Sequence, residues 1–367
     1  MPDPRVINLA NVLVNYSTKV QPGDWVQIVT THAAMPLVNE LYKAILAAGG
    51  YPAVMFNSDQ LAETYLAHAN DEQLKWANPA AQLMIEQVDV LMSVRAPENT
   101  RALSGIDPKR QQAQQIARKE WIDVYRKRSA SGDLRWNITN YPCLALAQEA
   151  DMSLSDYENF IFRATFADQD DPVAEWERIH AEQQHKVDWL AGKKTFEIKG
   201  AHADLTMSIE GRPFINSAGD KNMPSGEVFT SPVEGSINGW VEFTYPVIHL
   251  GREVEGVRLE FKDGKVVKAT AEKNEDYLIQ VLDTDEGARY LGELGIGTNF
   301  GIDRFTKDIL YDEKIGGSFH LAVGSGFAQI GGKNESIIHW DMICDAREDT
   351  EMLVDGELFY KNGKFMV

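Results

Sequence analysis

The chain has 367 residues, of which 44% are hydrophobic and 25% are charged. Its 36 basic and 55 acidic side chains give a net charge of −19, which argues against nucleic-acid binding because contact with phosphates needs a basic surface. No segment approaches the roughly 18 uncharged apolar residues of a membrane span, and residues 1–20 lack the pattern of a signal peptide. Two cysteines, Cys143 and Cys344, form no disulfide framework. We therefore expect a soluble cytoplasmic protein, and its length suggests two domains.

Strand-like and helix-like stretches alternate in the first half of the chain. Residues 35–50 have the apolar period of a helix and end at a Gly-Gly pair. Four apolar runs are typical of strands: 24–30, 51–57, 88–94 and 134–139. Such alternation predicts βαβ units and a parallel sheet. No G-x-G-x-x-G follows the first strand, so a dinucleotide site is not indicated.

Residues 145–192 are predicted to be helical and contain His180 and His185. These histidines are five apart, whereas two ligands on one helical face are three or four apart, so we expect surface or packing roles. From about residue 194 the pattern changes to short strands, with a hairpin at Asp263 and Gly264 and one helix over 274–294. The predicted domains are therefore 1–194 and 195–367.

Five ligand-type residues in the second half lie in unusual surroundings. Glu227 follows a Pro/Gly turn, Glu293 ends the predicted helix, and His320 lies among small and apolar residues. His339 and Asp341 lie two apart in an apolar strand-like run, so they share one face. Each has an ordinary alternative, as a solvated carboxylate or a core histidine. Together they are the ligand types of a dinuclear hydrolase site without thiolates, which suits zinc, cobalt or manganese.

Four segments in this order resemble the aminopeptidase T (aminopeptidase S/T) family of dinuclear metallo-aminopeptidases: "MPSGEVFTSP", "YLGELGIGTN", "ILYDEKIGGSFHLAVGSG" and "IIHWDM". The resemblance is clear over residues 220–345. In the first half it rests on the alternation of predicted helices and strands and on the segment "LVNYSTKVQPGDWVQI". It implies two different α/β domains, an N-terminal parallel-sheet domain and a C-terminal β-rich, open-barrel-like metal domain. It also implies that Glu227, Glu293, His320, His339 and Asp341 bind two divalent ions, with Glu227 or Glu293 bridging them.

The resemblance further implies an aminopeptidase that acts on peptides with a free N-terminus, with Glu293 as a catalytic proton carrier, and a homodimer. One departure is that Phe327 occupies the place, seven residues after His320, where the family has a tyrosine. We expect Asp312 and Glu313 to form a polar loop. The alternative is that they contact the metal ligands without binding the metal themselves. Lys333 and Asn334 either contact substrate or simply form a loop.

Two other functions stay open at this level. Ring-cleaving dihydroxypyridine dioxygenases resemble this fold, but they hold one iron with two histidines and a carboxylate and replace a family glutamate with histidine. Because this chain keeps Glu227 and Glu293, the two-metal peptidase is preferred. The second alternative is a catalytically quiet metal-binding relative, which Phe327 would suit.

Overall fold

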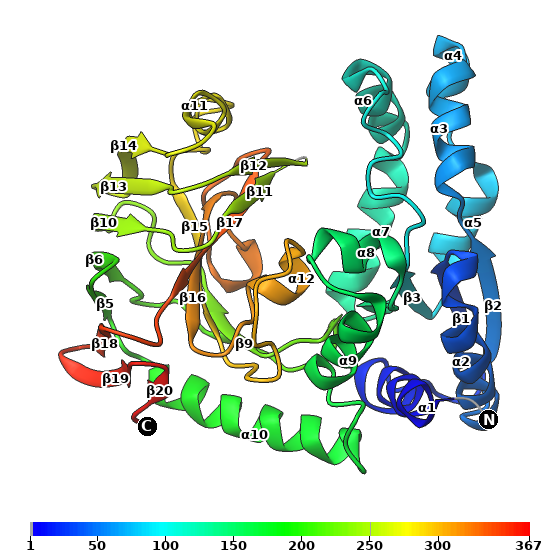
Figure 1. Cartoon of the computed structure of the whole chain (residues 1–367), viewed down its shortest axis with the longest axis horizontal. Helices are drawn as coiled ribbons and strands as arrows, with labels where there is room; N and C mark the ends of the chain where they lie inside the picture. The colour runs from blue at the N-terminus through cyan, green and yellow to red at the C-terminus, as the bar shows by residue number, and fades with distance from the viewer. Residues whose placement is uncertain (1–2, 250) are drawn as a thin grey trace. The chain divides into compact units, whose positions relative to one another are not determined.

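The computed structural model describes residues 3–249 and 251–367, which form two compact units (Figure 1). One unit comprises the residues up to Glu175 together with Gly219–Pro224, and the other comprises Trp176–Ala218 and Ser225–Val367. The expected change from helix to strand near residue 194 occurs where α10 (Pro172–Leu190) is followed by β5 (Thr195–Gly200). The predicted domain limits at 194 and 195 stay a prediction.

A five-stranded parallel sheet forms the centre of the first unit, in the order β2-β1-β3-β4-β8. Its strands are β1 (Trp25–Thr30), β2 (Tyr51–Phe56), β3 (Val90–Arg95), β4 (Arg135–Asn140) and β8 (Asn222–Met223). The first four agree with the predicted strands to within about two residues. Strands β1 and β3 are buried along most of their length, as expected for a parallel sheet covered on both faces.

Helices precede the first of these strands and join the others. They are α1 (Pro4–Asn11), α2 (Met35–Ala47), α3 (Asp59–His68), α4 (Asp71–Leu74), α5 (Pro79–Gln87), α6 (Pro108–Ala117), α7 (Lys119–Ser131), α8 (Leu144–Glu149) and α9 (Leu154–Ala164). In α2, Leu37, Leu41 and Ile45 recur every four residues and are all buried, which is the one-sided pattern of a helix on a sheet. Ile85 of α5 packs in the same apolar cluster as Trp121 of α7 and Leu91 of β3.

The second unit contains an antiparallel eight-stranded sheet in the order β14-β13-β10-β6-β5-β18-β19-β20. Besides β5, its strands are β6 (Ala203–Ser208), β10 (Asn238–Glu242), β13 (Arg258–Lys262), β14 (Lys265–Thr270), β18 (Thr350–Val354), β19 (Glu357–Lys361) and β20 (Lys364–Phe365). The predicted hairpin is confirmed, because Asp263 and Gly264 join β13 to β14 with positive φ angles. Trp189 of α10 stacks on Phe359 of β19, which places this helix against the sheet.

A second antiparallel sheet has five strands in the order β17-β16-β15-β9-β7. These are β7 (Ile215–Ser217), β9 (Glu227–Thr230), β15 (Leu291–Gly297), β16 (Ser318–Gly324) and β17 (His339–Asp345). Every residue of β15 and β16 is buried. A two-stranded ribbon, β11 (Val247–His249) and β12 (Arg252–Val254), and two helices, α11 (Glu275–Leu282) and α12 (Ile309–Asp312), complete the unit.

The helix predicted over 274–294 is wrong in its second half. Helix α11 ends at Leu282, and Glu293 lies within strand β15 instead of at a helix C-terminus. The reason is tertiary, because β15 pairs with both β16 and β9 and is buried on both faces, so its sequence lacks the alternation that identifies a strand.

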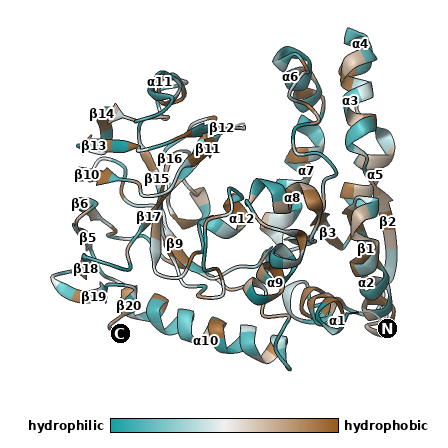
Figure 2. Ribbon diagram, in the orientation of Figure 1, coloured by the Kyte–Doolittle hydropathy of each residue, from teal (hydrophilic) through white to brown (hydrophobic). Residues whose placement is uncertain are grey.

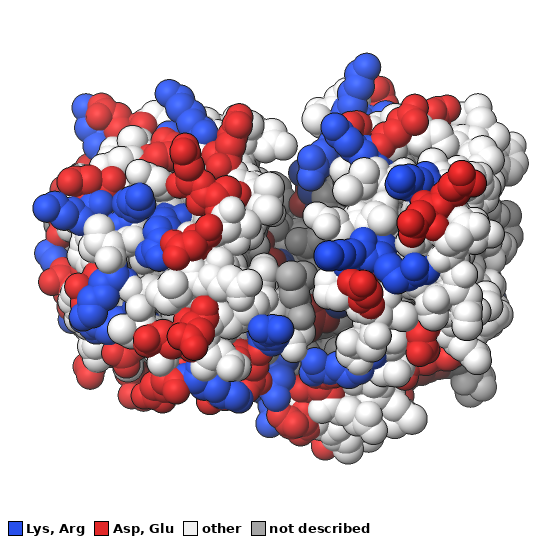
Figure 3. Space-filling model, turned by 90° about the horizontal axis from the view of Figure 1, so that it is seen from above, with Lys and Arg blue, Asp and Glu red and all other residues white. Residues whose placement is uncertain are grey.

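Hydrophobic residues concentrate along the strands of both units (Figure 2). On the face of each unit seen in Figure 3, acidic and basic side chains are interspersed. Among the helices of the described residues, none is both long enough and apolar enough to span a bilayer.

Candidate metal centre

Four neighbouring strands carry the five predicted ligands on one face of the second sheet. Glu293 of β15 and Asp341 of β17 both pair with Ala322 of β16, so they lie in one row across the sheet. His320 lies two residues before Ala322 on the same face, and His339 lies two residues before Asp341. Glu227 begins β9, on the other side of β15. The small Ala322 leaves room between the two carboxylates of its row.

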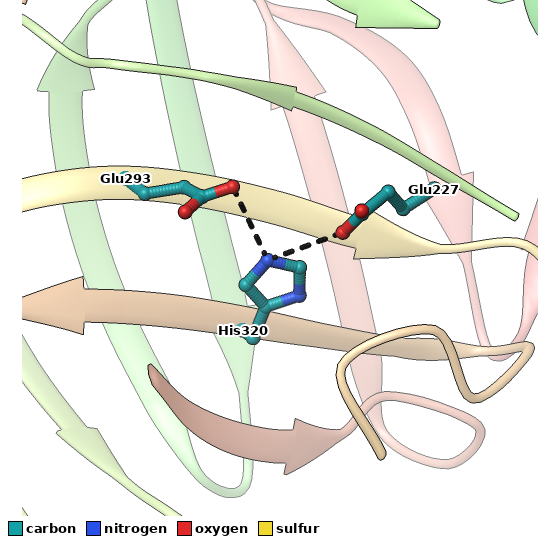
Figure 4. A group of neighbouring side chains, drawn as sticks. All are labelled: Glu227, Glu293 and His320. Carbon is teal, nitrogen blue, oxygen red and sulfur yellow. Dashed lines mark ion pairs between the residues drawn. The ribbon is translucent and has the colours of Figure 1, made fainter. Parts of the chain in front are cut away.

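The ligand atoms fall into two groups that share Glu293. One group is Glu227, Glu293 and His320, and the other is Glu293, His339 and Asp341, and within each group these atoms lie within 4.8 Å of one another. Figure 4 shows the first group, with the His320 imidazole between two glutamates. Its Nε2 lies 3.5 Å from Glu227 Oε2 and 3.5 Å from Glu293 Oε1.

The second group is arranged around the other oxygen of Glu293. His339 Nε2 lies 3.0 Å from Glu293 Oε2 and 3.5 Å from Asp341 Oδ1. The two oxygens of Glu293 therefore face different histidines. A carboxylate in this position is the one that can bridge two cations.

Several buried polar atoms in the site lack a hydrogen-bond partner among the described residues. They include both ring nitrogens of His320 and Oδ1 of Asp341. A buried polar group without a partner is costly, and a bound cation removes that cost for imidazole nitrogens and carboxylate oxygens alike. The residues therefore fit divalent metal ions.

Electrostatics supports the same interpretation. Burial lowers the pKa of His320, but the carboxylates of Glu293 and Glu227 more than offset this and raise it to about 9. Burial likewise opposes the effect of Asp341 and Glu293 on His339, whose pKa is raised to about 11. The pKa of Glu227 is raised by burial, although Lys314 and His320 act against this. This cluster of carboxylates attracts positive charge, which protons supply when metal ions are absent.

The loop before β16 contributes a residue that sequence reasoning missed. Lys314 is fully buried, and its Nζ lies 3.8 Å from Glu227 Oε1 and contacts the carboxylate of Glu313. Burial lowers the pKa of Lys314, but Glu313 and Glu227 more than offset it and raise the pKa above its ordinary value. Burial raises the pKa of Glu313 to about 7 against the opposing effect of Lys314. Glu313 therefore does not only form a polar loop, because it pairs with Lys314, which lies beside the predicted ligand Glu227.

The backbone of Glu227 is also held in place. Gln183 of α10 is buried and donates from Nε2 to the carbonyl oxygen of Glu227 at 3.1 Å, while its Oε1 accepts from Thr298. No pattern in the sequence indicates this role for Gln183. His180 and His185 lie on the same helix and are exposed, as expected.

Phe327 lies beside the second group. Its ring centroid is 5.3 Å from that of His339 and 5.4 Å from that of Phe229. Its amide donates to the Ser231 hydroxyl at 3.0 Å, which holds the loop. Phe327, which lacks the hydroxyl of the family's tyrosine, therefore contacts the predicted ligand His339. On the next part of this loop, the Lys333 backbone amide donates to Glu234 and the Asn334 side chain donates to backbone carbonyls, so both contacts hold the loop.

The chain is similar along nearly its whole length to a known peptidase family. The sequence model described as "Thermophilic metalloprotease (M29)" matches residues 3–365. The chain belongs to this family. The M29 assignment confirms the family resemblance. Because this is a family of metalloproteases, the assignment also implies divalent metal ions as cofactors.

Individual relatives agree with the M29 assignment. Aminopeptidase 2 of Geobacillus stearothermophilus is 28% identical over 97% of this chain and 94% of its own length. Aminopeptidase T of Thermus aquaticus is 31% identical over 68% of each chain. The solved structure of wild-type AmpT from Thermus thermophilus matches with a TM-score of 0.87 over 99% of both chains at 24% identity, which confirms the fold. The predicted enzyme class, a metal-dependent aminopeptidase, and the mixed α/β fold are both confirmed.

The dioxygenase alternative finds no support in the site. It expects histidine in place of a family glutamate, whereas Glu227 and Glu293 both lie among the grouped residues. Three carboxylates accompany two imidazoles, and they divide into two groups. This arrangement and the M29 assignment both favour the peptidase.

Proposed function

We propose that this metal-dependent aminopeptidase removes N-terminal residues from peptides by means of two divalent ions. Glu227, Glu293 and His320 would hold one ion, and Glu293, His339 and Asp341 would hold the other. The observation that carries the proposal is the sharing of Glu293, whose two oxygens face the two histidines at 3.5 and 3.0 Å. When bound, a pair of divalent ions lowers the pKa of a water molecule and polarises the scissile carbonyl.

Glu293 is the residue that we assign to proton transfer. It is the carboxylate common to both groups, and its side chain is only 7% exposed. A carboxylate placed there could accept a proton from the attacking water and deliver it to the leaving amine through an oxygen that is released from its ion during the reaction. Burial keeps bulk water from competing for that proton.

Substrate would approach on the side of His339. The His339 side chain is 31% exposed, whereas those of Asp341, Glu293 and His320 are 12%, 7% and 1% exposed. A peptide entering there meets several carboxylates, which favour a free α-ammonium group over a blocked terminus. The Phe327 ring forms part of the wall at this entrance and offers no hydrogen-bond donor to the developing oxyanion.

The nitrogen and oxygen ligands suit zinc, cobalt or manganese, because no thiolate is present in either group. We also propose a homodimer in the cytoplasm, which rests on the family resemblance.

The test is hydrolysis of aminoacyl p-nitroanilides by metal-depleted protein to which zinc, cobalt or manganese is added back singly. We expect activity to return with at least one of these metals. An N-acetylated substrate with the same residue is the control and should not be cleaved. Cleavage of the blocked substrate at the same rate would contradict recognition of a free N-terminus.

A further inference from the structure

The five predicted ligands differ in the hydrogen bonds and ion pairs that hold their side chains in place. His339 Nδ1 lies 2.8 Å from the carbonyl oxygen of Ser325. Because a carbonyl only accepts, Nδ1 carries the proton, and Nε2 faces Glu293 and Asp341 as a ligand. A metal-binding histidine is typically oriented in this way. His320 differs, since its Nδ1 has no hydrogen-bond partner within the described part of the chain.

Lys314 adds a second difference between the two groups. Its ammonium lies 3.8 Å from Glu227 Oε1, while Glu227 Oε2 lies 3.5 Å from His320 Nε2. One oxygen of Glu227 thus faces a permanent cation, and only the other faces the position of a metal ion. The group of Glu293, His339 and Asp341 has no lysine among its ion pairs in the described residues.

The backbone holds Lys314 in this position. Its carbonyl accepts the amide of Asn299 at 3.1 Å, and the Asn299 carbonyl accepts the amide of Gly316 at 2.9 Å. Asp312, just before it, accepts from the amide and hydroxyl of Thr306 at 2.7 and 2.8 Å. A fully buried side chain on a loop fixed in this way cannot swing into solvent when a cation binds nearby.

We propose that Lys314 makes the two ion positions unequal. The position formed by Glu293, His339 and Asp341 fills first, and the position that includes Glu227 and His320 fills second. The ammonium repels a second cation and occupies one oxygen of Glu227, so it weakens that position more than the other, although its charge also acts on Asp341. Lys314 is a positioning residue that acts through Glu227, and Glu313 is its counter-ion. This inference rests on the proposed two-ion function.

Titration of the metal-depleted full chain with Co²⁺ tests the inference, with heat and the visible absorption of bound cobalt recorded together. Wild-type protein should show two steps. Lys314→Met should tighten the second step roughly ten- to a hundred-fold, the range over which groups behind a ligand alter metal affinity, and tighten the first step much less. Lys268→Met is the matched control, since Lys268 is 62% exposed and also pairs with a glutamate.

Further variants keep the test decisive if Lys314→Met is unstable. Glu313→Gln leaves the ammonium without its counter-charge, so the second step should weaken. Asp341→Asn should remove the first step, and Glu227→Gln should remove the second. Two equal steps in the wild type, or a second step that moves in neither Lys314→Met nor Glu313→Gln, overturn the inference alone. One bound equivalent in every protein overturns the two-ion proposal as well.

Discussion

Gly295 stands directly opposite His320 in adjacent strands, and a Cβ at Gly295 would lie 2.1 Å from the imidazole Nε2. Real Cβ atoms do not approach other atoms so closely, so the ring occupies space that only glycine leaves. The ring could not lie across β15 beside Glu293 if any other residue stood there. The position of one predicted ligand therefore depends on a glycine in the neighbouring strand.

Gly295→Ala should displace the imidazole and weaken one metal position while the chain still folds. Overpacking of this kind costs about 1–3 kcal/mol of stability. Metal content and melting temperature measured together would show both effects. Gly235→Ala is the control, because no atom lies within 4 Å of a Cβ there and its φ is unexceptional. Unchanged metal content in Gly295→Ala would mean that His320 is not a ligand.

Glu293→Gln should lose roughly 10²–10⁴-fold in turnover, the usual contribution of a general acid–base group, while the fold survives. The amide keeps the shape of the side chain but can neither carry the proton nor bridge two cations as a carboxylate does. Turnover of an aminoacyl p-nitroanilide and circular dichroism would measure the two effects. Glu286→Gln, at an exposed position in the same unit, should keep wild-type activity. Near-full activity in Glu293→Gln would remove this residue from the mechanism.

The sequence predicted the parallel sheet, the β-rich second half and the strand that carries His339 and Asp341. It misplaced Glu293 because strand β15 is buried on both faces, and a run without alternation of apolar and polar residues does not distinguish strand from helix. Lys314 was missed for a different reason. Its backbone is held by hydrogen bonds between the loop and Asn299, which lies 15 residues earlier in the chain. Residue spacing alone does not predict such contacts between separate segments.

Phe327→Tyr should raise turnover modestly with little change in metal content. The phenol would stand beside His339, where it could donate to the developing oxyanion. A well-placed donor of this kind is worth about 10²–10³ in rate, but the loop around Phe327 is packed for a hydroxyl-free ring, so the gain should be smaller. A hydroxyl without a partner would instead cost about 1–3 kcal/mol. Flat turnover with a lower melting temperature would show that Phe327 only packs against Phe229 and His339.

The metal-free protein should lose stability as the pH rises through about 9 to 11. The pKa values of His320 and His339 are raised to about 9 and about 11, from an ordinary 6.5, so the folded chain keeps protons that the unfolded chain loses. The stabilisation is complete below pH 6.5 and disappears above the raised values. Urea unfolding at pH 7 and above pH 10 would measure it. Metal-loaded protein should lack this dependence because metal replaces the protons, and equal dependence in both forms would contradict the site.

The central claim is that two divalent ions share Glu293. Its most direct test is the number of metal ions bound per chain when hydrolysis of an aminoacyl p-nitroanilide reaches its maximum during titration of metal-depleted protein. The account predicts two ions per chain at full activity. Full activity with one ion per chain would contradict it.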